Sequence, residues 1–159
     1  HVADDVVGRA AFRRYHLMAA GTGPGTTAGW HGSAADRRGL TDLVERYFAA
    51  VDRMDLAETL AGFTEDARVT IATFDAVYHG RDAEVRGMYE RLFARYASVW
   101  HGDFDHVAQA PDRIASQFTV RNVSLQGGLT VKHNCNFFRL RNGLVCDMSV
   151  YMSGDNSLR

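Results

Sequence analysis

The sequence predicts an α+β domain in which a curved antiparallel sheet wraps around three helices to form a cone. Two observations lead to this fold class. Apolar residues recur at helical spacing in three segments between residues 40 and 96, and from Trp100 onward they alternate with polar residues, as strands require. Because the helices carry wide apolar faces that cannot stay in water, the sheet has to cover them. A cone with a half-open mouth follows.

The first helix is expected from Leu40 to Val51, with Asp42 and Glu45 in its first turn, where the helix dipole favours anions. A shorter helix follows Asp55, because Asp55 and Glu58 have the spacing of a capping box. The two helices are therefore expected to be joined by a tight turn.

A small hairpin is expected next, because Val69 and Ile71 alternate with polar neighbours and Val77–His79 is a second short extended segment. Asp82 then has the properties of an N-cap for the third helix. The apolar residues of this helix share one face: Val85, Met88, Tyr89, Leu92, Phe93 and Tyr96.

Four long strands complete the pattern and are expected to form an antiparallel meander. Their ranges are Trp100–Gln109, Arg113–Ser124, Leu129–Arg141 and Leu144–Met152. Turn-forming pairs separate them: Pro111-Asp112, Gly127-Gly128 and Asn142-Gly143.

The chain is long enough for one core and too short for two, since it has 159 residues of which 46% are hydrophobic. We divide it into an N-terminal arm with a Gly-rich linker (1–39), the α+β domain (40–153) and a C-terminal tail (154–159). Residues 23–28 formally match a dinucleotide-binding fingerprint. They follow no strand and include Pro24, so they indicate a flexible connector.

Charge and hydropathy exclude two classes of partner. Eighteen basic residues nearly balance nineteen acidic ones without a basic run, so nucleic acid is not an expected partner. No apolar stretch approaches the roughly 20 residues that span a bilayer, so no membrane contact is expected and the sequence predicts a soluble, cytoplasmic protein.

Cysteine and histidine spacing gives two further expectations. Cys135 is expected to face a residue near Val150, ~13 Å along the strand from Cys146, which is too far for a disulfide. His101, His106 and His133 have no dedicated ligand spacing, so neither a metal nor another cofactor is expected.

The order of elements over residues 40–153 resembles the SnoaL-like branch of the nuclear transport factor 2-like superfamily. The most specific similarity is the segment Arg46–Asp55, together with Val99-Trp100-His101. Both are closest to the dehydratases of this superfamily, scytalone dehydratase and bile-acid 7α-dehydratase. The resemblance implies an acid–base site made of Tyr47, Asp52 and His101.

These three residue types suit proton transfer on a carbonyl compound. A His can abstract a proton near neutral pH, a carboxylate fixes its tautomer, and a phenol can stabilise an enolate. On an ideal helix Asp52 is rotated about 140° from Tyr47, so both reach one pocket only if the helix ends or bends there. Otherwise Asp52 is a solvated helix end, His101 an edge-strand surface residue and Tyr47 a core aromatic.

The strands supply the remaining lining of the expected pocket. Strand alternation places Asn134, Asn136 and Phe138 on one face with Lys132, which is expected to reach solvent near the start of its strand. The family register adds an apolar wall formed by Met148, Val150 and Met152. Each of these apolar residues is also compatible with an ordinary core position.

The expected function is that of a cofactor-independent enzyme acting on a hydrophobic carbonyl compound, such as a polyketide-like intermediate. Dehydration by a lyase is favoured over aldol cyclisation because the Tyr, Asp and His set resembles the dehydratases, and isomerisation is the other reaction expected of such a site. Ketosteroid isomerase activity is disfavoured, because residues 70–72 lack the carboxylate of that enzyme.

The alternative is a small-molecule-binding or assembly module without catalysis, because one fold serves many functions. A pocket with Asp52 and His101 in hydrogen-bond reach favours the enzyme, and a filled cone favours the module. A homodimer or higher oligomer is expected under both, formed through the outer sheet face at Cys135, Phe137 and Tyr151.

Overall fold

The computed structural model describes residues 36–159, so residues 23–28 and nearly all of the expected arm lie outside the described residues. Within this range the α-helices are α2 (Arg37–Asp52), α3 (Leu56–Ala61) and α4 (Arg86–Arg95). The strands are β1 (Phe63–Ile71), β2 (Ala76–His79), β3 (Tyr96–Gln109), β4 (Arg113–Ser124), β5 (Leu129–Arg141) and β6 (Leu144–Met152). The last three strands have the bounds that the sequence predicts. No helix in the described range is long and apolar enough to cross a membrane.

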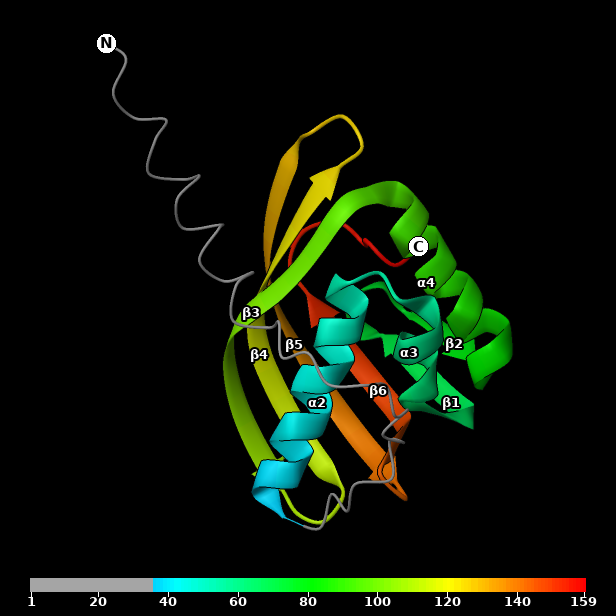
Figure 1. Ribbon diagram of the computed structural model, residues 1–159, viewed down its shortest axis with the longest axis vertical. Coiled ribbons are helices and arrows are strands. Elements are labelled where there is room, and N and C mark those ends of the chain that lie inside the picture. The colour runs from blue at the N-terminus through cyan, green and yellow to red at the C-terminus, as the bar shows by residue number, and fades with distance from the viewer. Residues whose placement is uncertain (1–35) are drawn as a thin grey trace, which may run out of the picture.

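The sheet has six strands in the order β2-β1-β6-β5-β4-β3 and curves around the helices, which confirms the predicted fold class (Figure 1). The pairs formed by β3, β4, β5 and β6 are antiparallel, as the meander requires. One pairing differs from the rest, because β1 lies parallel to β6. The chain returns to β1 with β6 only after the meander, so the earliest and the last strands are neighbours in the sheet.

Helix α2 crosses the concave side of the sheet and supplies much of the core. It starts at Arg37 instead of Leu40, because the Asp36 carboxylate accepts a hydrogen bond of 2.7 Å from the Gly39 backbone N–H. Asp42 is therefore outside the first turn, contrary to expectation. The buried residues follow the predicted face: Leu40, Leu43, Val44, Tyr47, Phe48, Ala50 and Val51.

Helix α3 begins as predicted, with Asp55 accepting a hydrogen bond of 2.9 Å from the backbone N–H of Glu58. Between α2 and α3, Met54 has a positive φ of 54°, which reverses the chain within two residues of Asp52. The tight turn between these helices is therefore confirmed.

The expected N-cap of the third helix is wrong. A π-helical turn, η2 (Gly80–Val85), precedes α4, and Glu84 accepts a 2.7 Å hydrogen bond from the His79 backbone N–H. Asp82 instead pairs with Arg81 at 2.6 Å and with Arg86 at 3.4 Å. Because Gly80 adopts a positive φ of 79°, the chain can enter the helical path before Asp82.

Strand β3 is bent near its middle. Its register with β4 shifts between Gly102 and Asp105, and Asp103 within this bulge has a positive φ of 55°. A Cβ on Gly102 would lie 2.3 Å from the Trp100 ring, so only glycine fits there. The bulge separates the two histidines of β3, His101 and His106, into different surroundings.

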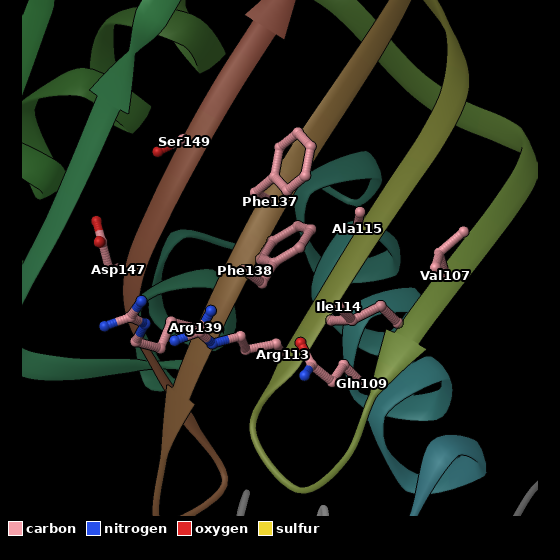
Figure 2. Close-up of a pocket in the computed structure, with 10 residues that line it drawn as sticks. All are labelled: Val107, Gln109, Arg113, Ile114, Ala115, Phe137, Phe138, Arg139, Asp147 and Ser149. Atoms are coloured by element: carbon pink, nitrogen blue, oxygen red, sulfur yellow. The ribbon is translucent and has the colours of Figure 1, made fainter.

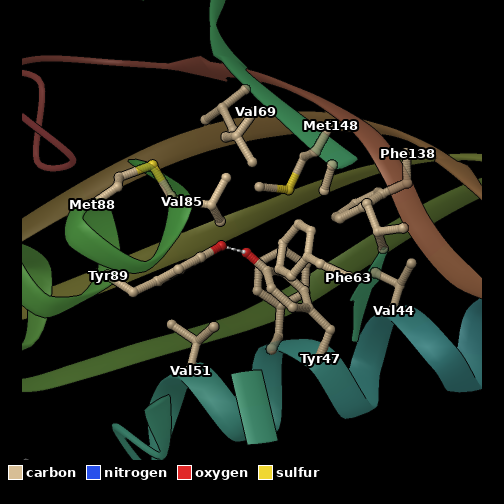
Figure 3. Packing of buried hydrophobic residues seen from close by; sticks show 14 of the residues in the cluster. Val44, Tyr47, Val51, Phe63, Val69, Val85, Met88, Tyr89, Phe138 and Met148 are labelled. Atoms are coloured by element: carbon tan, nitrogen blue, oxygen red, sulfur yellow. Dashed lines mark hydrogen bonds between the residues drawn. The ribbon is translucent and has the colours of Figure 1, made fainter. Parts of the chain in front are cut away.

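The core fills the space between the helices and the concave face of the sheet. Tyr47 from α2 and Tyr89 from α4 point toward one another within this cluster, between Phe63 and Met88 (Figure 3). Their meeting point lies where two helices and the sheet converge. The aromatic hydroxyls are thus brought into the interior by the packing of apolar faces.

The outer face of the sheet carries the residues expected there. Phe137 and Tyr151 are 53% and 46% exposed, and their ring centroids are 5.8 Å apart. Cys135 lies opposite Tyr151 in the register, away from Cys146, and both cysteines are free. The register therefore agrees with the expectation that these two cysteines lie too far apart for a disulfide.

Candidate active site

Asp52 of α2 and His101 of β3 form a hydrogen-bonded pair. Asp52 Oδ1 lies 2.6 Å from Nδ1 of His101, and Asp52 Oδ2 accepts a 3.1 Å hydrogen bond from the His101 backbone N–H. The two side chains are 23% and 11% exposed. One carboxylate therefore holds both the ring and the backbone of His101, which fixes the orientation of the imidazole.

On an ideal helix Asp52 is rotated about 140° from Tyr47, and the end of α2 explains how Asp52 still reaches His101. Asp52 is the last residue of α2, so its side chain leaves the helix just where the chain turns away toward Met54. His101 comes from β3, immediately before the bulge at Gly102. The end of the helix, rather than its periodicity, thus brings the carboxylate to the histidine.

Tyr47 lines the same cavity, and its hydrogen-bond partner is Tyr89, a residue that the expected site did not include. Its hydroxyl is hydrogen-bonded at 2.5 Å to the hydroxyl of Tyr89, and within the described residues it makes no hydrogen bond to Asp52 or His101 (Figure 3). Burial raises the pKa of Tyr47 and Tyr89 well above the usual value, and the nearby charge of Asp52 raises the pKa of Tyr47 further. Both phenols therefore stay neutral.

The cavity in front of the dyad is small, with a volume of about 40 Å³. His101, Tyr47 and Tyr89 line it together with five of the predicted pocket residues: Asn134, Asn136, Met148, Val150 and Met152. Phe138 does not line it. Its ring lies 5.8 Å from Tyr47 and 6.0 Å from Phe48, among the aromatic residues of the core.

The sheet wall of this cavity carries three buried amides. Asn122, Asn134 and Asn136 line the cavity, and the Oδ1 atom of each is buried without a hydrogen-bond partner among residues 36–159. A buried acceptor without a partner costs about 1–3 kcal/mol, so these oxygens favour a ligand or water that donates hydrogen bonds. Sequence reasoning missed Asn122, although the alternation from Val120 along β4 indicates its inward position.

The C-terminal segment covers the cavity. Ser157 and Leu158 belong to its lining, and the Leu158 carbonyl accepts a 3.1 Å hydrogen bond from the Tyr78 hydroxyl. Lys132, expected to reach solvent, is only 3% exposed, and its Nζ donates to the Asp155 carbonyl oxygen. The reason for this difference is the covering segment, whose position the strand pattern of β5 does not encode.

A second histidine cluster lies further along β3, past the bulge. Nδ1 of His106 is 2.8 Å from the Ser116 hydroxyl, and its Nε2 is 3.3 Å from Oε1 of Glu45 on α2. Ser116 is fully buried, so no substrate reaches its hydroxyl. Although the residue types match a catalytic triad, their arrangement ties two strands and a helix together.

A larger hollow of about 390 Å³ lies on the outer face of the sheet, in front of Phe137 and Ala115 (Figure 2). Its charged lining residues are Arg113, Arg139 and Asp147. It contains no histidine and no pair able to exchange a proton near neutral pH. The acid–base groups therefore lie in the smaller cavity.

Histidines, cysteines and carboxylates form no group of three or more with the spacing to hold a metal ion anywhere in residues 36–159. The Asp52–His101 pair is a candidate site for proton transfer, because a histidine paired with a carboxylate can accept and return a proton near neutral pH.

Comparisons with known proteins agree with this architecture. Residues 44–148 match the family described as SnoaL-like domain. A comparison with curated proteins found no significant match.

Solved structures share the fold at low sequence identity. A candidate polyketide cyclase from Xanthomonas campestris pv. campestris is 23% identical, with a TM-score of 0.66 over 72% of this chain and 90% of the other. A candidate polyketide cyclase from Pseudomonas putida KT2440 is also 23% identical, with a TM-score of 0.65 over 76% and 91%. A protein with a ketosteroid isomerase-like fold from Catenulispora acidiphila is 14% identical, with a TM-score of 0.62 over 69% and 84%.

Proposed function

The chain belongs to the SnoaL-like domain family, and on this basis we propose that it is a cofactor-independent enzyme that moves a proton on a hydrophobic carbonyl compound. The observation that carries the proposal is the 2.6 Å contact between Asp52 and Nδ1 of His101 at the wall of a buried cavity. Family membership and the names of structural neighbours, which include polyketide cyclases, support an enzyme of this type.

His101 acts as the base. Because Nδ1–H donates to Asp52, the lone pair of Nε2 is available, and this nitrogen makes no hydrogen bond to any residue of 36–159. Nε2 takes the proton from the carbon next to the substrate carbonyl. The imidazolium that forms is stabilised by the Asp52 carboxylate.

The tyrosine pair stabilises the resulting enolate. Two hydroxyls share one hydrogen bond, so one of the two protons stays between Tyr47 and Tyr89 and the other is free to be donated into the cavity. The raised pKa of both groups keeps them protonated, so the enolate oxygen receives a hydrogen bond from a neutral phenol.

Dehydration follows if the substrate carries a hydroxyl on the β carbon. The C–H electrons form the enolate, the enolate expels hydroxide, and the proton on Nε2 of His101 converts it to water. The conjugated carbonyl product retains every other atom. We favour dehydration over isomerisation and cyclisation because the Tyr47, Asp52 and His101 set resembles the dehydratase branch.

A second function is favoured by the cavity volume. A space of about 40 Å³ holds water but no drug-sized ligand, which needs roughly 300 Å³ or more. A nearly filled cone fits a binding or assembly module without catalysis. The two functions differ in whether the covering segment gives way to a substrate.

The test is the dehydration of the β-hydroxy ketone formed from acetone and benzaldehyde, which yields benzylideneacetone and is followed by ultraviolet absorbance. Exchange of the α-protons in D₂O is measured in parallel by NMR. The proposal expects catalysed exchange and elimination, both lost in His101→Ala. Exchange without elimination would indicate an isomerase, and neither reaction with this or related ketones would favour the module.

A further inference from the structure

The strands place a buried cation in the same row of the sheet as the candidate base. His101 of β3 pairs with Val120 of β4, and Val120 pairs with Lys132 of β5. His101 and Lys132 are thus two strand spacings apart, about 10 Å between their Cα atoms. The interior side of this row therefore presents an acid–base group at one end and an ammonium group at the other.

A second cation binds the same C-terminal segment as Lys132. Arg95, the last residue of α4, donates from its guanidinium to the main-chain oxygens of Asn156 at 3.4 Å and Arg159 at 3.3 Å. Burial lowers the pKa of Lys132, the Asp155 carboxylate raises it, and the charge of Arg95 lowers it. The two positive charges are therefore close enough to repel each other.

Neither cation is paired with an acidic side chain. Among residues 36–159, no Asp or Glu side-chain oxygen lies within 4.0 Å of a side-chain nitrogen of Lys132 or Arg95. The hydrogen bonds of both side chains go to main-chain oxygens of residues 155–159. Lys132, which binds the carbonyl dipole of Asp155, is less well compensated than a lysine paired with an anion.

The segment that supplies these carbonyls is also the cover of the cavity. Ser157 and Leu158 line a space of about 40 Å³, too small for an organic substrate of more than a few atoms. A larger ligand must displace this segment. Displacement removes the carbonyl partners of Lys132 and Arg95 at the same moment as it opens the site.

We propose that the substrate is a hydrophobic carbonyl compound that also carries a carboxylate, and that this carboxylate binds Lys132 and Arg95 in place of the main-chain oxygens of residues 155–159. The inference rests on the proposed function only for the position of the reacting carbon near His101. The carboxylate is held at the far end of the row, so it serves as a remote handle. The binding free energy of the carboxylate offsets the free energy needed to displace residues 155–159 from the cavity.

The experiment compares two probes of equal shape, β-naphthoate and the neutral β-naphthamide, by isothermal titration calorimetry on the full chain. We expect the carboxylate to bind at least tenfold more tightly than the amide. Lys132→Met removes this preference and Lys132→Arg retains most of it. Equal affinity of the two probes, an unchanged preference in Lys132→Met, or no binding of either probe would overturn the proposal.

Two further variants keep the result interpretable. Arg121→Gln removes one positive charge from a side chain stacked on Trp100, 4.4 Å from its ring centroid, and should leave the preference unchanged. Arg95→Gln, on a half-buried side chain, should reduce the preference even if Lys132→Met fails to fold. If Arg95→Gln keeps the full preference, the proposal is wrong.

The same titration separates this inference from the proposed function. Asp52→Asn should strongly lower turnover of the β-hydroxy ketone while leaving the carboxylate preference intact. If the wild-type protein shows the preference without any turnover, the cation pair is a binding site and the proposed chemistry fails alone.

Discussion

Strand β3 carries two histidines that are similar in burial and in having a carboxylate partner, but only one of them keeps a ring nitrogen available. His101 and His106 are 11% and 12% exposed, and each contacts a carboxylate from α2, Asp52 or Glu45. His101 uses Nδ1 alone and keeps Nε2 without a partner among the described residues. His106 uses both ring nitrogens, and its Ser116 partner is fully buried.

This difference shows that a histidine beside a carboxylate is not by itself a reactive site. What matters is whether one ring nitrogen remains available and faces a cavity. The bulge between Gly102 and Asp105 produces the difference, because it changes the register of β3 between the two histidines. His101 thus belongs to the cavity and His106 to the scaffold.

The largest effect is expected from matched changes of the two carboxylates. Asp52→Asn should lower kcat for the β-hydroxy ketone by about 10²–10⁴-fold, because the amide leaves His101 in the wrong tautomer and its imidazolium unstabilised. Glu45→Gln, the same change beside His106, should alter kcat by less than about threefold, because a half-exposed carboxylate contributes little. Steady-state kinetics measure both. Comparable losses in the two variants would contradict the distinction.

A second effect is expected at alkaline pH. Burial raises the folded-state pKa of Tyr47 and Tyr89 above the ordinary tyrosine value of 10.0, so their stability contribution is full below pH 10 and is lost as pH rises through the folded-state values. Above pH 10 each should lower the free energy of unfolding by about 1.4 kcal/mol per pH unit. Urea denaturation at several pH values measures the slope.

Two variants check the origin of that slope. Tyr89→Phe removes one titrating group, so its stability should fall less steeply above pH 10 than that of the wild-type protein. Ser116→Ala changes only the His106 cluster and should keep the wild-type slope. A Tyr89→Phe slope equal to wild type would mean that the tyrosines are not the titrating groups.

Asn136 tests the border between the two regions, because it pairs with Ser116 in the register and also lines the cavity. Asn136→Leu removes a buried acceptor without a partner, so the free energy of unfolding should rise by about 1–2 kcal/mol. Binding of β-naphthol relative to naphthalene should weaken, since the hydroxyl loses its acceptor. Thermal denaturation and fluorescence titration measure the two effects. A destabilised variant with unchanged binding would assign Asn136 to the scaffold.

The smallest effect is expected in the scaffold itself. Ser116→Ala removes the hydrogen bond to Nδ1 of His106, which should cost about 1 kcal/mol of stability. Turnover and its pH profile should stay as in the wild-type protein, because the bulge separates this cluster from His101. A shifted pH profile would show that the two histidines are coupled.

Much of the fold was predictable because it follows from local pattern. The alternation of residues 113–152 gives the last three strands with their bounds, and the spacing of Asp55 and Glu58 gives the cap of α3. Asp82 was mispredicted because Gly80 starts a π-helical turn before it, a backbone choice that side-chain patterns do not reveal.

The sequence by itself determined the cone, its helix faces and the inward positions of Asn134 and Asn136, because 3.6-residue and two-residue periods are set by backbone geometry. Only the tertiary structure decided which groups meet. It joined Asp52 to His101 where α2 ends, paired Tyr47 with Tyr89 across two helices, and folded residues 155–159 over Lys132. These contacts depend on where elements end and how segments distant in the chain pack, and no local period carries that information.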